Sequence, residues 1–359
     1  MNYRLASILA NKSMGASGTE VVDIDLAQPI SAIVITTRLT NSLSTPVAHA
    51  VDAISKIEIV DGSNVIYSLS GKQAEAMDFY STGKIRPRLL PYVASTQLVI
   101  PYFLNFGRDL WDRELALDPR KFTNLQLRIT HAYASGGNTG NALELMADAY
   151  IFDERAISPV GFLMQKQIKS YALVNSTWEY TDLPTDYAYR LIMIASQYTR
   201  MHPHNLFREI KLSENVDQRI PFNMLTMDLI KMIQTRFPEY VEEMAGLATA
   251  AEQAFFITPS YSPRLSFSSD NQATAAYFGQ HYANGGTVTI VGSDTAYFKA
   301  NVAGWCPHGA VVLPCYGRDE LDDMYDVSKI KSLKLELKGG TSATSTGNAA
   351  ICIQQVKKY

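Results

Sequence analysis

The chain has 359 residues, of which 47% are hydrophobic and 19% are charged, and these values exclude a disordered or fibrous protein. Its formal net charge of −3 argues against direct, sequence-specific binding of nucleic acid, because neutralising several phosphates needs clustered Lys and Arg. The length is sufficient for two cores of ordinary domain size.

The first 18 residues contain the short apolar stretch LASILA between Arg4 and Lys12, followed by Gly and Ser residues. This stretch is far shorter than the roughly 20 residues of a membrane-spanning helix. We predict an N-terminal arm over residues 1–18 that becomes ordered only against neighbouring molecules or lipid head groups.

The first half then reads as short strands separated by Gly- and Asn-containing loops. A helix is predicted over residues 71–83, with Ala74 and Met77 on one face and Gly83 at its end. Period-two alternation of apolar residues predicts strands at residues 19–26, 32–40, 54–62, 64–70, 96–104, 125–133 and 142–152. Many short strands and one helix are typical of a sandwich with jelly-roll wiring.

The second half repeats this order of elements. The corner Asp182-Leu183-Pro184 corresponds to Asp25, Leu26 and Pro29, and the strand with Ile210 and Leu212 corresponds to the strand with Ile57 and Ile59. A helix is again predicted, over residues 223–237, with Leu225, Leu229 and Ile233 forming one stripe. The repeated order indicates an internal duplication.

Two segments that begin with Gly-Arg-Asp extend the repeat. Gly107 and Gly317 each start such a segment, and an alternating apolar strand follows each, with Leu125, Leu127 and Ile129 in the first copy and Leu333, Leu335 and Leu337 in the second. We predict that the two segments are equivalent turns, in which Arg108 and Arg318 pair with nearby carboxylates such as Asp112 and Asp322.

The second half carries an insertion. The offset between the halves grows from 153 residues at Ile57 and Ile210 to 210 residues at Gly107 and Gly317, so 57 residues (210 − 153) are added between about 238 and 305. We predict extra strands and long loops there, on the outer surface, because surface loops tolerate long insertions. Its aromatic residues include Tyr261, Phe267, Tyr277, Phe278 and Tyr282.

These observations predict a mainly all-β protein with two tandem eight-stranded jelly rolls, each with a short helix after its fourth strand. We place the arm at 1–18, the first jelly roll at 19–160 and the second at 161–359, with the insertion at about 238–305.

Candidate chemical sites are few. His202 and His204 could offer two imidazoles to a metal, but they have no carboxylate or thiolate close by in sequence, and a solvated loop is the simpler interpretation. The six histidines are His49, His131, His202, His204, His281 and His308, and the three cysteines Cys306, Cys315 and Cys352 show no metal-site or disulfide spacing.

An acidic cluster near residue 320 has two interpretations, a calcium site or the charged face of a short helix. It comprises Asp319, Glu320, Asp322, Asp323 and Asp326. A carboxylate pair for glycoside hydrolysis could converge from any two strands, and the sequence identifies no such pair. We therefore assign no catalytic, cofactor-binding or metal-binding residue.

The tandem pattern and the corner STWEYTDLPTDYAYRL together resemble one known family. The corner Asp182-Leu183-Pro184 followed by Tyr189-Arg190 is similar to the start of the second jelly roll in double jelly-roll major capsid proteins. These proteins form the shells of tailless icosahedral phages with an internal membrane, the tectivirus, corticovirus and autolykivirus lineage.

The resemblance implies a non-enzymatic virion protein without cofactors. It implies homotrimeric, pseudo-hexameric capsomers that assemble in the host cytoplasm into an icosahedral lattice, with penton, minor capsid and membrane proteins as partners and the N-terminal arm on the lipid. Two alternatives remain open, a secreted-type two-jelly-roll hydrolase (amidase or glycosidase) and a carbohydrate-binding spike protein.

Overall fold

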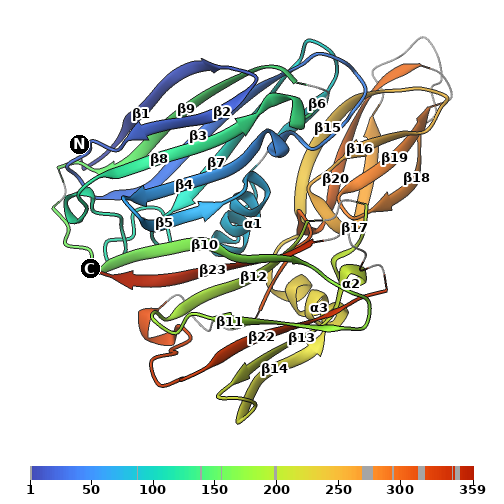
Figure 1. The fold of residues 1–359 in the computed structure, drawn as a ribbon. Coiled ribbons are helices and arrows are strands. Elements are labelled where there is room, and N and C mark those ends of the chain that lie inside the picture. Colours follow the sequence, from blue (N-terminus) through green and yellow to red (C-terminus); the bar gives the residue numbers. More distant parts are fainter. Residues whose placement is uncertain are drawn as a thin grey trace.

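The computed structural model describes residues 2–86, 88–137, 140–154, 156–197, 200–268, 278–292, 295–313, 320–341, 343 and 348–359. Strands dominate the chain, and they form two sandwiches and a smaller module that protrudes beside them (Figure 1). Among the described residues, no helix is long and apolar enough to cross a membrane.

The first jelly roll has eight strands in two sheets, as predicted. One sheet has the order β1-β9-β3-β7, and the strands of the other run β2-β8-β4-β5. Their bounds are β1 Tyr3–Met14, β2 Ser17–Asp23, β3 Ile30–Asn41, β4 Ile54–Asp61, β5 Asn64–Leu69, β7 Gln97–Asn105, β8 Leu125–Ala132 and β9 Gly140–Phe152.

The second jelly roll repeats this wiring strand for strand. Its sheets run β10-β23-β12-β21 and β11-β22-β13-β14, the order of the first jelly roll with each strand replaced by its counterpart. The bounds are β10 Gly161–Ala172, β11 Trp178–Leu183, β12 Tyr189–Ser196, β13 Phe207–Glu214, β14 Arg219–Leu225, β21 Ala310–Val312, β22 Leu333–Gly339 and β23 Asn348–Lys358.

Even the irregularities of the sheets recur. The bulge between Ser7 and Leu9, where β1 pairs with β9, returns between Gln167 and Lys169, where β10 pairs with β23. The bulge after Ile30 in β3 likewise returns after Tyr189 in β12. Because bulges fix the local register of a strand pair, they identify equivalent residues in the two halves.

The N-terminal segment is the main correction to the sequence prediction. Residues 3–14 form β1, which pairs with β9 of the same chain and is the counterpart of β10, so they are not an arm that needs neighbours or lipid for order. The bulges between Ser7 and Leu9 and between Leu9 and Lys12 break the period-two alternation by which a strand is recognised in sequence. Counting β1, each helix follows the fifth strand of its jelly roll.

The two long helices begin and end differently. In α1 (Gly71–Thr82), Ser70 and Gln73 form a reciprocal capping box, and Gly83 ends the helix in the left-handed conformation at φ 66°. Its counterpart α3 (Thr226–Arg236) has Leu225 at its N-cap, with no side-chain cap bond among the described residues. The predicted helices are confirmed, although α3 begins after Leu225.

One continuous sheet joins the two jelly rolls. Strand β5 of the first pairs in parallel with β10 of the second, with Tyr67 opposite Gln165 and Ser68 opposite Lys166. Two four-stranded sheets thereby become the eight-stranded sheet β2-β8-β4-β5-β10-β23-β12-β21. Helix α1 lies beside this junction (Figure 1).

The inserted module lies between α3 and β21 in the sequence, and it forms two small sheets of its own. One sheet has the order β17-β20-β15-β6 and the other β16-β19-β18. Strand β6 (Leu89–Tyr92) comes from the first half, and the insertion supplies β15 Tyr240–Ala248, β16 Gln253–Phe256, β17 Pro259–Ser268, β18 Phe278–Asn284, β19 Thr287–Gly292 and β20 Ala296–Pro307. Extra strands were predicted here, and Figure 1 shows them at the end of the molecule opposite both chain ends.

Candidate functional site: the joint between the jelly rolls and its free counterpart

Helix α1 is enclosed where the two jelly rolls meet. Almost every residue of α1 is buried, including Met77 at 0% exposure. Across the joint, Arg190 of β12 donates to the Ser81 hydroxyl at 2.6 Å and to the Ser81 carbonyl at 2.8 Å. The Tyr80 hydroxyl donates to the carbonyl of Ala310, also at 2.8 Å. The sequence predicted one buried face for this helix, whereas the second jelly roll covers the others.

Strand β12 shows the same effect from the other side. All eight of its residues are buried, because α1 covers one face of its sheet and the second jelly roll's core lies on the other. The run YRLIMIAS is accordingly almost continuously apolar, as expected for a strand buried on both faces.

A buried ionic cluster fastens the inserted module to the joint. Arg88, just before β6, lies 2.8 Å from the carboxylate of Glu75 on α1 and 3.1 Å from that of Glu242 on β15. All three side chains are at most 7% exposed. The backbone N–H and the hydroxyl of Thr258 each donate to Glu242 at 2.7 Å. One set of charges therefore links α1 and the segment before β6 to β15, which is about 150 residues further along the chain.

Two histidines complete the cluster. His308, in the turn between β20 and β21, lies 3.0 Å from Glu75 through Nε2. The His49 ring lies edge-on to the His308 ring, with centroids 5.0 Å apart. The Tyr240 hydroxyl donates to Glu75, so this carboxylate has partners from three segments. Such satisfaction is what a buried charge requires.

The cluster sets the charge states of its members. Burial by itself raises the pKa of Glu75, but the nearby Arg88 guanidinium and His308 imidazole outweigh burial and hold that pKa below its usual value. Burial lowers the pKa of His49 well below 6.5, and the charge of Arg88 lowers it further. Glu75 is therefore ionised and His49 neutral near pH 7.

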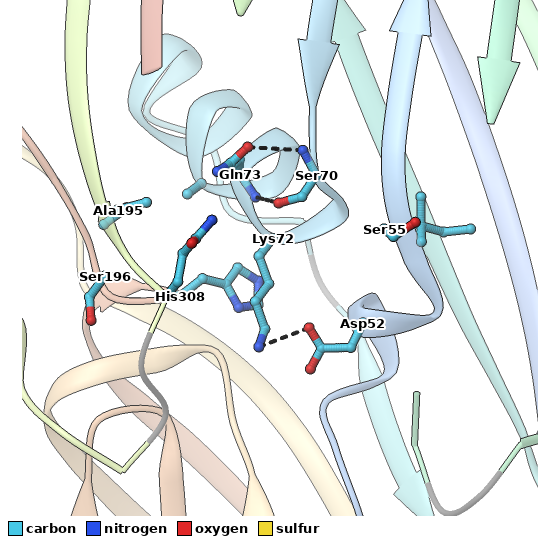
Figure 2. Close-up of a pocket in the computed structure, with 12 residues that line it drawn as sticks. Asp52, Ser55, Ser70, Lys72, Gln73, Ala195, Ser196 and His308 are labelled. Atoms are coloured by element: carbon cyan, nitrogen blue, oxygen red, sulfur yellow. Dashed lines mark hydrogen bonds and ion pairs between the residues drawn. The ribbon is translucent and has the colours of Figure 1, made fainter. Parts of the chain in front are cut away.

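A hollow of about 270 Å³ opens beside the cluster, between the start of α1 and the end of β12 (Figure 2). The polar groups around it already have structural partners. Lys72 is 2.8 Å from Asp52, Ser70 caps the helix through Gln73, and His308 is paired with Glu75. These three side chains therefore stabilise the fold around the hollow and do not form a nucleophile with its base.

The joint has an uncovered counterpart in the second jelly roll. Strand β14, the equivalent of β5, is the outermost strand of its sheet. Met232 is the seventh residue of α3, as Met77 is of α1, yet Met232 is 45% exposed. Ile220 and Leu225 of β14 and Met227 of α3 are also more than 40% exposed. A hollow of about 250 Å³ lies beside α3, lined in part by Met232, Phe237 and Val312.

The first jelly roll has the complementary uncovered surface. Strand β1, the equivalent of β10, is the outermost strand of the sheet β1-β9-β3-β7. In β3, buried and partly exposed residues alternate, in contrast to the fully buried β12. Leu5 of β1 is 52% exposed, whereas Gln165, its equivalent in β10, is 3% exposed and donates to the Asn105 carbonyl.

The histidine pair singled out from the sequence is not in a solvated loop. His202 precedes the short helix α2 (Pro203–Leu206), which contains His204, and the two half-buried rings stack 5.5 Å apart beside Tyr261. His202 Nδ1 is 2.8 Å from the carbonyl of Ser260. Within the described ranges, no group of three or more His, Cys, Asp or Glu side chains could hold a metal ion.

The acidic cluster and the Gly-Arg-Asp segments are described in part. Leu321–Asp323 form a short 3-10 turn, and the Asp326 carboxylate accepts bonds from Ser328. The prediction for Arg108 is confirmed, because its guanidinium donates to Asp112 at 2.7 Å. Cys315, Gly317, Arg318 and Asp319 lie outside the described residues.

Sequence reasoning missed the members of the ionic cluster. Glu75 stands at a helix position that α3 fills with the buried Ile230, and a charged residue among Ala74, Ala76 and Met77 was the available signal. Its partner Arg88 also pairs with Glu242, which is 154 residues further along the chain, so this second pairing has no local signature.

Comparisons with known proteins identify the fold. No protein-family model and no curated protein matches the chain in sequence. Among solved structures, the STIV MCP is similar over 99% of this chain and 96% of its own, with a TM-score of 0.62 and 10% identity.

Two further similar structures are PBCV-1 VP54 and the major capsid protein P2 from bacteriophage PM2. Their TM-scores are 0.58 and 0.52, at 11% and 10% identity, over 99% of this chain and 94% and 98% of theirs. The chain has the double jelly-roll fold of these proteins, as the sequence analysis predicted.

Proposed function

We propose that the chain is the major subunit of a viral capsid, which assembles as homotrimers into an icosahedral shell around an internal membrane. The observation that carries the proposal is the duplicated jelly-roll architecture of this chain, together with its structural similarity over nearly the whole length of proteins named as major capsid proteins. A structural role needs no catalytic residue, and the polar groups around the hollow of Figure 2 are engaged in structural contacts.

Three copies suit the pattern of covered and uncovered surfaces. Each chain leaves two different faces open, one on β14 and α3 and one on the sheet β1-β9-β3-β7. Two different faces make a head-to-tail contact, which yields a ring when the rotation closes. Because each chain supplies two similar modules, three chains give six modules with a nearly hexagonal outline. Such outlines tile a shell, whose lateral edges would also meet penton and minor capsid proteins.

The two ends of the molecule suit an outer and an inner surface. The chain termini lie at one end and the inserted module at the other (Figure 1). Near the termini, Leu110, Val160 and Tyr359 are exposed, and Lys121 lies 5.9 Å from the Tyr359 ring. Exposed apolar groups beside cations suit a lipid surface. This end would face the membrane, with the insertion outward, in a virion assembled in the host cytoplasm.

The purified protein tests the assembly directly. Light scattering after chromatography should give the mass of a trimer, and negative-stain images should show hexagonal outlines. A chain that stays monomeric across micromolar concentrations, or one with hydrolytic activity, overturns the proposal.

Orientation needs separate measurements. Limited proteolysis of intact particles should cut between Ser260 and Ala283 if the module faces outward, whereas protection there would place it inside. Trimers should co-sediment with anionic vesicles, and Leu110→Asp should weaken this, with the similarly exposed Val241→Asp on β15 of the inserted module as control.

A further inference from the structure

The joint inside the chain provides a template for the contact between chains. Parallel pairing of β5 with β10 covers the edge of one four-stranded sheet with the first strand of another. Strands β14 and β1 are the counterparts of β5 and β10, and both are outermost strands of their sheets. Open strand edges present unpaired N–H and C=O groups, which favour addition of a further strand.

We propose that β14 of one copy pairs in parallel with β1 of a second copy, as β5 pairs with β10 within the chain. The inference rests on the proposed trimer, and it adds which strands meet, in which direction and in which register. The interface would join the sheet β11-β22-β13-β14 of one copy to the sheet β1-β9-β3-β7 of the next.

The register follows from counting along equivalent strands. Tyr67 lies four residues before the first residue of α1, and Phe222 lies four before the first residue of α3. On the other strand, Gln165 lies two residues before the bulge residue Gln167, and Leu5 lies two before the bulge residue Ser7.

The known pairs of the joint then translate directly. Tyr67 opposite Gln165 becomes Phe222 opposite Leu5 of the second copy, and Ser68 opposite Lys166 becomes Asn223 opposite Ala6. Opposite residues of neighbouring strands lie on the same face of the sheet, so Leu5 would lie on the face to which Phe222 belongs.

The exposure of individual side chains supports a second copy of the chain as the partner of β1 and β14. Gln165 is 3% exposed because the joint covers it, while its equivalent Leu5 is 52% exposed in the single chain. Met77 and Met232 show the same contrast on the helices, at 0% and 45%. The positions that a second copy would cover are thus occupied by exposed apolar residues. Exposed apolar surface of this kind is typical of a contact between proteins.

The sheet and helix of the interface also differ in charge from the joint. Helix α3 carries Lys231 and Arg236, where α1 has Ala76 and Ser81. On the facing sheet, Asp148 of β9 pairs with Ser7 of β1 as Cys352 of β23 pairs with Gln167 of β10, so Asp148 is the counterpart of Cys352. In the proposed interface, the sheet of one copy therefore carries a carboxylate and the helix of the other copy carries cations. These opposite charges favour contact between the copies.

A disulfide cross-link tests the register. The double variant Ala6→Cys, Asn223→Cys should form covalent dimers and closed trimers under oxidation, seen on a non-reducing gel and lost on reduction. The variant Lys166→Cys, Ser68→Cys should close the same bond within one chain. In Ala6→Cys, Arg219→Cys the second thiol lies four residues away, roughly 13 Å along the strand, so no cross-link should form.

The outcomes separate this inference from the proposed function. A trimer by light scattering that does not cross-link, or cross-links equally through Arg219→Cys, overturns the strand pairing and leaves the capsid proposal standing. A monomer at all concentrations overturns both.

A second variant tests the same interface in case the double-cysteine variants do not fold. Leu5→Asp should raise the dissociation constant of the trimer at least tenfold, because a carboxylate would be buried beside Phe222 of the neighbouring copy. Val21→Asp on β2, which is 50% exposed, should leave the trimer intact, since Tyr180 at the equivalent place in β11 is also 50% exposed. Equal effects of the two substitutions would contradict the proposed interface.

Discussion

Helices α1 and α3 occupy the same place in the two jelly rolls, yet one is enclosed and the other is half exposed. Both follow the fifth strand of their jelly roll, and both have a Met at the seventh position. The difference is that the second jelly roll of the same chain covers α1, whereas α3 has no such cover in the described part of a single chain. The same helix position is therefore buried in one jelly roll and exposed in the other. This difference in burial decides how much a residue there contributes to the free energy of unfolding.

The largest expected effect comes from the ionic cluster, which the second jelly roll lacks at Ile230. Replacing Arg88 by Met leaves the buried carboxylates of Glu75 and Glu242 without their cation, at a cost of about 3–5 kcal/mol in the free energy of unfolding. Urea unfolding at fixed protein concentration measures it. Arg4→Met, which breaks an exposed pair with Asp153, should cost about 1 kcal/mol or less, and equal costs would contradict the cluster's role.

The two equivalent methionines give the most direct comparison of the halves. Met77→Ala should reduce the free energy of unfolding by about 2–5 kcal/mol, because it leaves a cavity in a fully buried site. Met232→Ala should cost far less in the unfolding of a single chain and should instead weaken trimer association, measured by dilution. Similar unfolding costs would show that the helices have similar environments in solution.

The pH dependence of stability should report on His49. Its pKa is lowered in the folded chain, so below about pH 6.5 the unfolded chain binds a proton that the folded chain does not. Stability should therefore fall as the pH drops from 7 to 5, by up to about 1.4 kcal/mol per pH unit from this group. His49→Gln should make the fall shallower.

Burial also lowers the pKa values of His131 and His204, so the His49→Gln variant should retain part of the fall. Urea unfolding at pH 7.5 and 5.5 compares the slopes, and an unchanged slope would rule out His49 as the titrating group. Glu75, whose pKa is held low, should stay ionised throughout this range.

The smallest effect should come from the helix caps. Ser70→Ala removes the capping box of α1 and should cost about 0.5–2 kcal/mol, whereas Leu225→Ala at the same place in α3 removes no cap bond. Thermal unfolding of both variants measures the difference. A larger destabilisation by Leu225→Ala would mean that its apolar contacts outweigh the cap.

The sequence determined the architecture, because strands, turns and caps are local. Alternating residues in the segment around Leu125 and Ile129, and again around Leu333 and Leu337, placed β8 and β22, and the repeated order revealed the duplication. Gly83 marked the end of α1, since only a residue tolerant of positive φ ends a helix in that way. The offset between the halves located the inserted module.

Only the tertiary structure decided which elements meet. Strand β1 escaped the sequence prediction because bulges hide its alternation, and pairing with β9 reveals it. The parallel pairing of β5 with β10, the enclosure of α1 and the ionic cluster of Arg88 with Glu75 and Glu242 join segments up to 230 residues apart (310 − 80). Burial and charge pairing depend on distances in space, and no periodicity along the chain encodes them.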